Sequence, residues 1–155
     1  STTLAGFWTG SYWATFTIGR ILAGLYANRL GVDVLVQGGI ITALLGSVLL
    51  WWNPFELANL IAVAMVGLAV APIFPAMISG TSRRVGPKDA ANTIGMQMAA
   101  TGLGGALITS IMGVLARRYS LEVIPVCLVL LFLLMFGLYR LAITTKGQEK
   151  YGHVA

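Results

Sequence analysis

The chain has 155 residues, of which 57% are hydrophobic and only 10% are charged, with a net charge of +5 and a mean hydropathy of +0.86. A soluble domain usually carries about 25% charged residues, so this chain lacks the polar side chains that a water-exposed surface needs. The composition predicts a surface that faces lipid and argues against a soluble enzyme. The basic residues lie mostly in short loops and the C-terminal tail, which is typical of loops facing a cytoplasm and argues against nucleic-acid binding.

Five apolar segments, each near the roughly 20 residues that cross a bilayer core, predict five transmembrane helices. They span residues 4–28, 33–52, 56–79, 92–116 and 121–143. The strands of a membrane barrel are about half as long and alternate apolar with polar residues, which these segments do not. The expected fold is therefore an all-α membrane protein over residues 1–143, followed by a polar cytoplasmic tail over 144–155.

The distribution of basic residues predicts the orientation of the chain. The loops after the odd-numbered segments and the tail hold most of them, whereas the opposite side holds only Arg117 and Arg118. The positive-inside rule then places the N-terminus of this chain outside and the C-terminus in the cytoplasm, in a plasma (inner) membrane. The chain opens directly on an apolar segment, which suggests a fragment of a longer protein.

The first segment carries an aromatic stripe. Trp8, Tyr12, Phe16 and Arg20 are spaced four residues apart, so they share one helix face, and Trp13 flanks them. One interpretation is a water-filled cavity in which the aromatic side chains stack on a solute, since a charge within a span seldom faces lipid. The other is ordinary packing, with the arginine snorkelling to the interface. The sequence leaves both open.

Two prolines in the third segment, Pro72 and Pro75, remove backbone donors and predict a broken helix. Transporters use such breaks near their sites and gates, but a tolerated kink is the alternative.

In the fourth segment, Gln97 shares a face with Thr93 and Thr101, and it hydrogen-bonds either a neighbouring helix or a ligand. Glycines on the same segment predict a close helix approach through Gly105, Thr109 and Gly113.

No cluster of His, Asp, Glu or Cys side chains stands out in the sequence. The five acids lie in loops, at helix starts or in the tail, and His153 lies near the C-terminus. We therefore expect no catalytic residues, no metal site, no cofactor and no enzyme activity.

Residues 19–31 resemble the loop signature of the major facilitator superfamily. The positions of the signature correspond to Arg20, Gly24, Asn28, Arg29 and Gly31. Residues 67–75 are similar to the tenth helix of its fucose-permease-like branch, and residues 92–118 to the eleventh. The succession of segments resembles helices eight to twelve, which belong to the C-terminal lobe. Two departures stand out: Asn28 replaces the acid of the signature, and Val32-Asp33 replaces its basic pair.

The resemblance implies a partial six-helix C-terminal lobe that lacks the N-terminal lobe and the seventh helix. The second and fifth segments are then outer supports, and the others line a central cavity. It implies secondary active transport of a small polar, sugar-like solute by alternating access, as a proton-coupled symporter. The candidate cavity residues are Trp8, Tyr12, Trp13, Phe16, Phe74 and Gln97. The alternative is a five-helix membrane scaffold or accessory subunit without transport activity.

Overall fold

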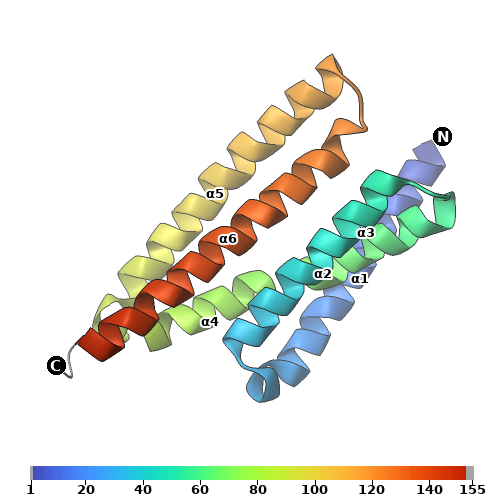
Figure 1. The fold of residues 1–155 in the computed structure, drawn as a ribbon. Helices are drawn as coiled ribbons and strands as arrows, with labels where there is room; N and C mark the ends of the chain where they lie inside the picture. Colours follow the sequence, from blue (N-terminus) through green and yellow to red (C-terminus); the bar gives the residue numbers. More distant parts are fainter. Residues whose placement is uncertain (1, 153–155) are drawn as a thin grey trace.

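The computed structural model describes residues 2–152, except for the side chains of residues 2–5, 27–28 and 145–152. Six helices make up this range, and no strand occurs within it (Figure 1). They are α1 (Thr2–Leu30), α2 (Val32–Trp52), α3 (Glu56–Val70), α4 (Ile73–Val85), α5 (Pro87–Arg118) and α6 (Val123–Gly152). The prediction of an all-α fold is confirmed.

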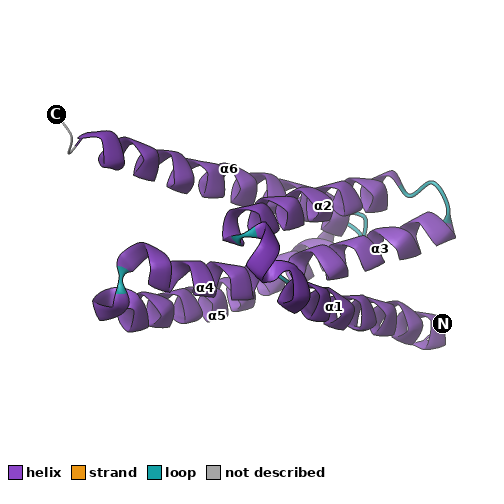
Figure 2. Ribbon diagram, turned by 90° about the horizontal axis from the view of Figure 1, so that it is seen from below, coloured by secondary structure: helices purple, strands orange, loops and turns teal. Residues whose placement is uncertain are grey.

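Four stretches of the described chain are long and apolar enough to cross a membrane: Val32–Trp52, Glu56–Val85, Pro87–Arg118 and Val123–Thr144. The second of them contains both α3 and α4, which are therefore two halves of one predicted span. Helix α1 has 29 residues, but its glycines, hydroxyl side chains and Arg20 make it less apolar than the others. The two termini lie at opposite ends of the bundle, which agrees with five crossings made by α1 and these four stretches (Figures 1 and 2).

The helix bounds differ from the expected segments mainly where a predicted loop is short. Helix α5 begins at Pro87 rather than at residue 92, because proline suits the first position of a helix and Asp89 favours its first turn. The connection from α4 is reduced to Gly86, whose φ of 81° suits glycine. Helix α6 runs to Gly152, beyond the expected end at 143, since the lysine, glutamine and glutamate there are good helix formers.

Helix α2 lies at the centre of the bundle and packs on α3, α4 and α6. Val36, Ile40, Ala43 and Ser47 are fully buried along it. The Ser47 hydroxyl donates to the Ala43 carbonyl at 2.8 Å, which satisfies the buried group within its own helix. The second segment, expected to be an outer support, thus packs at the centre of the described bundle.

Glycines bring α1 and α2 close to α3 and α4. A Cβ on Gly39 would lie 2.7 Å from the Ala69 carbonyl oxygen, and one on Gly19 would lie 2.6 Å from the Leu68 carbonyl oxygen. Close backbone approach through small residues is the usual way in which membrane helices associate.

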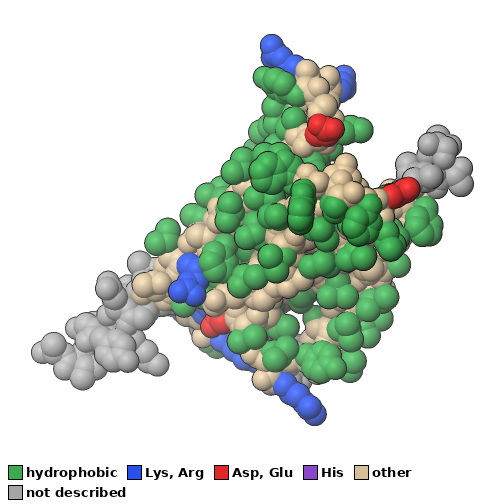
Figure 3. All heavy atoms as spheres, turned by 45° about the vertical axis from the view of Figure 1, so that its right-hand side comes forward, with side chains coloured by type: hydrophobic (Ala, Val, Ile, Leu, Met, Phe, Trp, Pro, Cys, Tyr) green, Lys and Arg blue, Asp and Glu red, His purple; other side chains and the backbone are tan. Residues whose placement is uncertain are grey.

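Helices α5 and α6 are joined by a short loop but contact each other little, and both are much less buried than α2, with α5 packed on α4 and α6 on α2 (Figure 2). Ala90 is the only buried residue of α5, and its glycines at 102, 104, 105 and 113 face open space, so the predicted glycine seam contacts no described residue. Hydrophobic side chains cover most of the visible face, with charged groups mainly toward its ends (Figure 3).

Candidate functional site

A cavity of about 620 Å³ lies between α1, α2 and α4. Its walls combine two guanidinium groups with mostly apolar side chains: Arg20, Ala23, Gly24, Val32, Leu35, Pro72, Phe74, Pro75, Ala76, Ile78, Ser79 and Arg83. The cavity forms because α1 packs along α3 but hardly touches α4. The chain turns at the junction of α3 and α4, and α4 then runs away from α1 (Figures 1 and 2).

The two prolines lie at this junction. Helix α3 ends at Val70 and α4 begins at Ile73, with Pro72 between them and Pro75 in the first turn of α4. Pro72 has no N–H to donate to the Leu68 carbonyl four residues earlier. Gly19 of α1 packs against that same carbonyl. The helix break and the close approach of α1 therefore meet at the inner end of the cavity.

The aromatic side chains of α1 form one cluster. The rings of Tyr12 and Phe16 stack with centroids 6.0 Å apart, and Trp13 meets them edge-on at 5.6 and 5.7 Å. The Arg20 guanidinium lies 5.0 Å from the centroid of the Phe16 ring. This cation–π contact holds the arginine at the inner end of the cavity. The structure thus brings together three of the four stripe residues, Tyr12, Phe16 and Arg20, with the flanking Trp13.

Arg20 lies deep in α1. Because the helix continues to Leu30, roughly 15 Å of helix separates Arg20 from that end, at 1.5 Å per residue. This is about half of the ~30 Å thickness of a bilayer core. A charge at that depth needs water or a polar partner, and the cavity wall provides an exposed position for it.

The other predicted cavity residues are dispersed. Trp8 lines a separate hollow of about 390 Å³ near the N-terminal end of α1. Gln97 lines a third cavity of about 560 Å³, between α4, α5 and α6. Its Oε1 lies 3.0 Å from the hydroxyl of the buried Thr81, so it joins α5 to α4. Phe74 lines this third cavity as well as the one that contains Arg20 and so separates the two.

The loop signature occupies the end of α1. Gly24 lines the cavity, with open space where a Cβ would lie. Gly31 makes the one-residue turn to α2 with a φ of 77°, which favours glycine. Arg29 is exposed, and the side chain of Asn28 lies outside the described residues.

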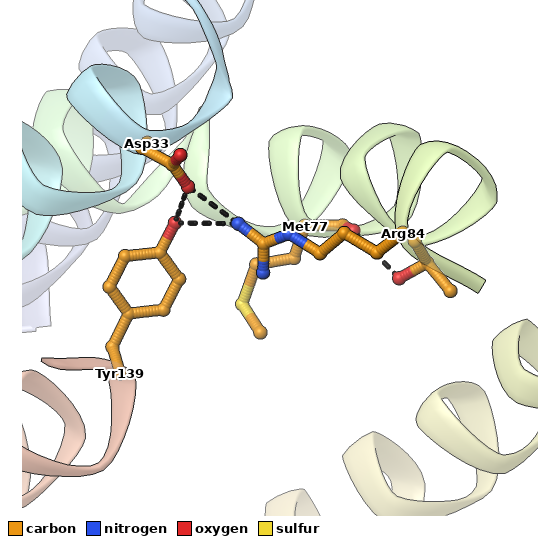
Figure 4. A network of polar contacts seen from close by, with 5 residues as sticks. Asp33, Met77, Arg84 and Tyr139 are labelled. Atoms are coloured by element: carbon orange, nitrogen blue, oxygen red, sulfur yellow. Dashed lines mark hydrogen bonds and ion pairs between the residues drawn. The ribbon is translucent and has the colours of Figure 1, made fainter. Parts of the chain in front are cut away.

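Sequence reasoning missed a polar cluster that joins three helices (Figure 4). Asp33 of α2 accepts hydrogen bonds from Arg84 of α4 at 2.5 Å and from the Tyr139 hydroxyl of α6 at 2.7 Å. The guanidinium also lies 5.9 Å from the centroid of the Tyr139 ring. One sequence signal could have found this cluster. All three residues follow or lie near the end of an odd-numbered apolar segment, so they are predicted to lie on the same, cytoplasmic side of the membrane.

Comparison with protein families connects this bundle to known proteins. The model of the Major Facilitator Superfamily matches residues 1–153, nearly the whole chain. No curated protein and no solved structure matches the chain.

Proposed function

Because the chain belongs to the major facilitator superfamily, we propose that it forms helices eight to twelve of the C-terminal lobe of a secondary active carrier. Members of this family are membrane transporters and not enzymes. The proposed cargo is a small polar solute with a sugar-like ring, and the proposed branch is the fucose-permease-like one. The carrier works by alternating access in a plasma (inner) membrane, with the N-terminus of this chain outside.

The observation that carries this proposal is the cavity beside the aromatic cluster of α1. A ring that is apolar on its faces and polar at its edge suits a wall that combines the Phe74 ring and Ile78 with Ser79 and two arginines. The aromatic cluster adjoins the cavity at Arg20, which contacts Phe16. The cavity also lies against a helix break, where a change in the angle of α4 would open or close it.

The exposed face of α5 supports the presence of a further lobe. Among the four apolar stretches, α5 is the least apolar. Its exposed part carries hydroxyl groups and glycines, including Thr101, Thr109 and Gly105, which suit contact with protein or water better than contact with lipid. We propose that the N-terminal lobe and a seventh helix, both outside this chain, face α5 across the transport pathway.

Proton coupling is part of the proposal, and the titrating group is expected in that further lobe. None of the residues that line the described cavity between α1, α2 and α4 is an acid. Intramembrane acids are the usual proton carriers of symporters.

The test is solute uptake by the product of the complete reading frame, reconstituted in vesicles. Phe74→Ala should lower uptake about fivefold or more, since this ring lines the cavity and loss of a stacking wall costs about one kcal/mol or more. Phe16→Ala should also lower uptake, because it removes the cation–π contact that positions Arg20. Leu25→Ala is the matched control, because this side chain on α1 is 68% exposed and does not line the cavity. Uptake that is equal in all three variants would rule out this cavity as the pathway.

The five-helix scaffold remains the alternative function. It predicts that the complete reading frame ends close to this chain and that the purified product transports nothing. A reading frame with about seven further apolar segments would exclude it.

A further inference from the structure

We propose that the transported solute is an anion, whose carboxylate or phosphate group binds Arg20 and passes Arg83 on the cytoplasmic side of the cavity. This inference rests on the proposed function and deepens it, since it names the chemical class of the solute. Both arginines line the same cavity between α1, α2 and α4.

Arg20 places a positive charge within the long helix α1. A guanidinium stays protonated at any physiological pH. Its contact with the Phe16 ring offsets part of the cost of a charge in the middle of α1, but a ring face supplies only about 0.5–2 kcal/mol. No described carboxylate lies within ion-pair distance of Arg20. The hydrogen-bonding edge of the guanidinium thus remains available to a ligand in the cavity.

Arg83 also lines the cavity without a described carboxylate partner. It lies two residues before the end of α4, about three turns from Pro72. In the proposed orientation this is the cytoplasmic end of the cavity. Its neighbour Arg84 is neutralised by Asp33, whereas no described carboxylate pairs with Arg83. The adjacent arginines therefore differ: one closes a structural ion pair, and the other faces the cavity.

The rest of the cavity wall also favours an anion. It contains no acid, and its remaining side chains are apolar apart from the Ser79 hydroxyl. A wall of this kind has a low local dielectric, which strengthens the attraction between a guanidinium and an anion. A neutral solute gains nothing from this attraction, whereas an anionic group on the solute does.

The two arginines then have different tasks. Arg20 at the inner end binds the anionic group in a charge-assisted, bidentate contact. Arg83 at the cytoplasmic end attracts the anion, which raises the rate of exchange between the cavity and the cytoplasm rather than the affinity of the bound state.

The test compares two matched probes on the complete carrier in phosphatidylcholine vesicles. Glucose and glucuronate share one ring and differ by a carboxylate, and glucose 6-phosphate adds the phosphate case. We expect at least one of the two anions, but not glucose, to raise the unfolding temperature and to be taken up.

The variants separate the two tasks. Arg20→Gln should weaken anion binding about tenfold or more, as loss of a hydrogen bond to a charged group does, and Arg20→Lys should restore only part of it. Arg83→Gln should slow exchange of the anion between the cavity and the cytoplasmic side, and the difference should disappear at high salt. Arg118→Gln, which removes the same charge at the far end of α5, should match the unmodified carrier.

Other outcomes separate the failure of this inference from that of the carrier proposal. Uptake of glucose without binding of either anion overturns the anion assignment and leaves the carrier intact. Binding of an anion that depends on Arg20, without any uptake, supports the anion site and overturns the carrier. A rise in unfolding temperature that occurs only with phosphatidylglycerol in the vesicles, and that Arg20→Gln abolishes, identifies a lipid headgroup and overturns the solute assignment.

Discussion

Gly39 and Gly38 are neighbours in α2 with opposite surroundings. A Cβ on Gly39 would meet the Ala69 carbonyl oxygen and Ile73, whereas Gly38 faces open space. Because helix packing in lipid depends on such close approaches, one methyl group decides whether α2 and α3 can meet.

We expect Gly39→Ala to lower the free energy of unfolding by about 1–3 kcal/mol, as overpacking of a tight core does. Gly38→Ala is the matched control and should raise stability by up to about 1 kcal/mol, since alanine is the better helix former. Thermal unfolding in detergent measures both. Equal effects of the two substitutions would mean that α2 and α3 do not pack as described.

Tyr139 is buried, and its hydroxyl completes the cluster with Asp33 and Arg84. We expect Tyr139→Phe to cost about 0.5–1.5 kcal/mol of unfolding free energy, because the ring stays in place and only the hydrogen bonds are lost. Tyr119→Phe, at a site that is 71% exposed, should have no effect. A neutral result for Tyr139→Phe in thermal unfolding would show that the cluster does not stabilise the bundle.

The division of one predicted span into α3 and α4 is the main feature at the scale of an element. The break diverts α4 from α1 and leaves the cavity that holds Arg20 and Phe74. The dihedral angles of Pro72, φ −79° and ψ −18°, are already helical. An alanine there fits the same backbone and regains a donor for the Leu68 carbonyl.

We therefore expect Pro72→Ala to stiffen the junction, to lower the rate of uptake several-fold and to keep or raise the unfolding temperature. Pro125→Ala is the control, since this proline lies in the first turn of α6, where backbone N–H groups lack helical acceptors. If the two substitutions change uptake alike, the break has no part in transport.

Sequence reasoning predicted elements better than contacts between them. The apolar lengths and the two prolines were enough to place the helices and their break, because hydrocarbon thickness and missing N–H groups act locally. The ion pair of Asp33 with Arg84 was not predictable, since it joins residues 51 positions apart through the way that α2 and α4 pack. The same limit applies to Trp8, which shares the stripe in sequence but lines a different hollow.

At the scale of the whole molecule, the bundle has a packed half and an open half. Helices α2, α4 and α6 share the hydrophobic core around Val36 and Ile40, and α1 packs on α3, whereas α5 contributes only Ala90 to the buried set. This asymmetry agrees with a lobe whose α5 faces further protein. The large hydrophobic side chains exposed along α1, α2 and α6, such as Leu25, Leu45 and Leu141, agree with contact to lipid.

The central claim is that an aqueous cavity reaches into a lipid-embedded bundle beside α1. Two neighbouring positions test it directly, because Gly24 lines the cavity and Leu25 points to the exposed surface. The measurement is the reaction of a membrane-impermeant thiol reagent with single cysteines in a carrier from which Cys127 and any other cysteine have been removed. Lys88→Cys, in the first turn of α5, and Ser120→Cys, in the loop that follows α5, should react from opposite sides of the membrane.

We predict rapid labelling of Gly24→Cys and almost none of Leu25→Cys. Equal labelling of both would show that no bilayer surrounds the helix. If neither position reacts although Lys88→Cys and Ser120→Cys do, then α1 borders no aqueous cavity, and the central claim is wrong.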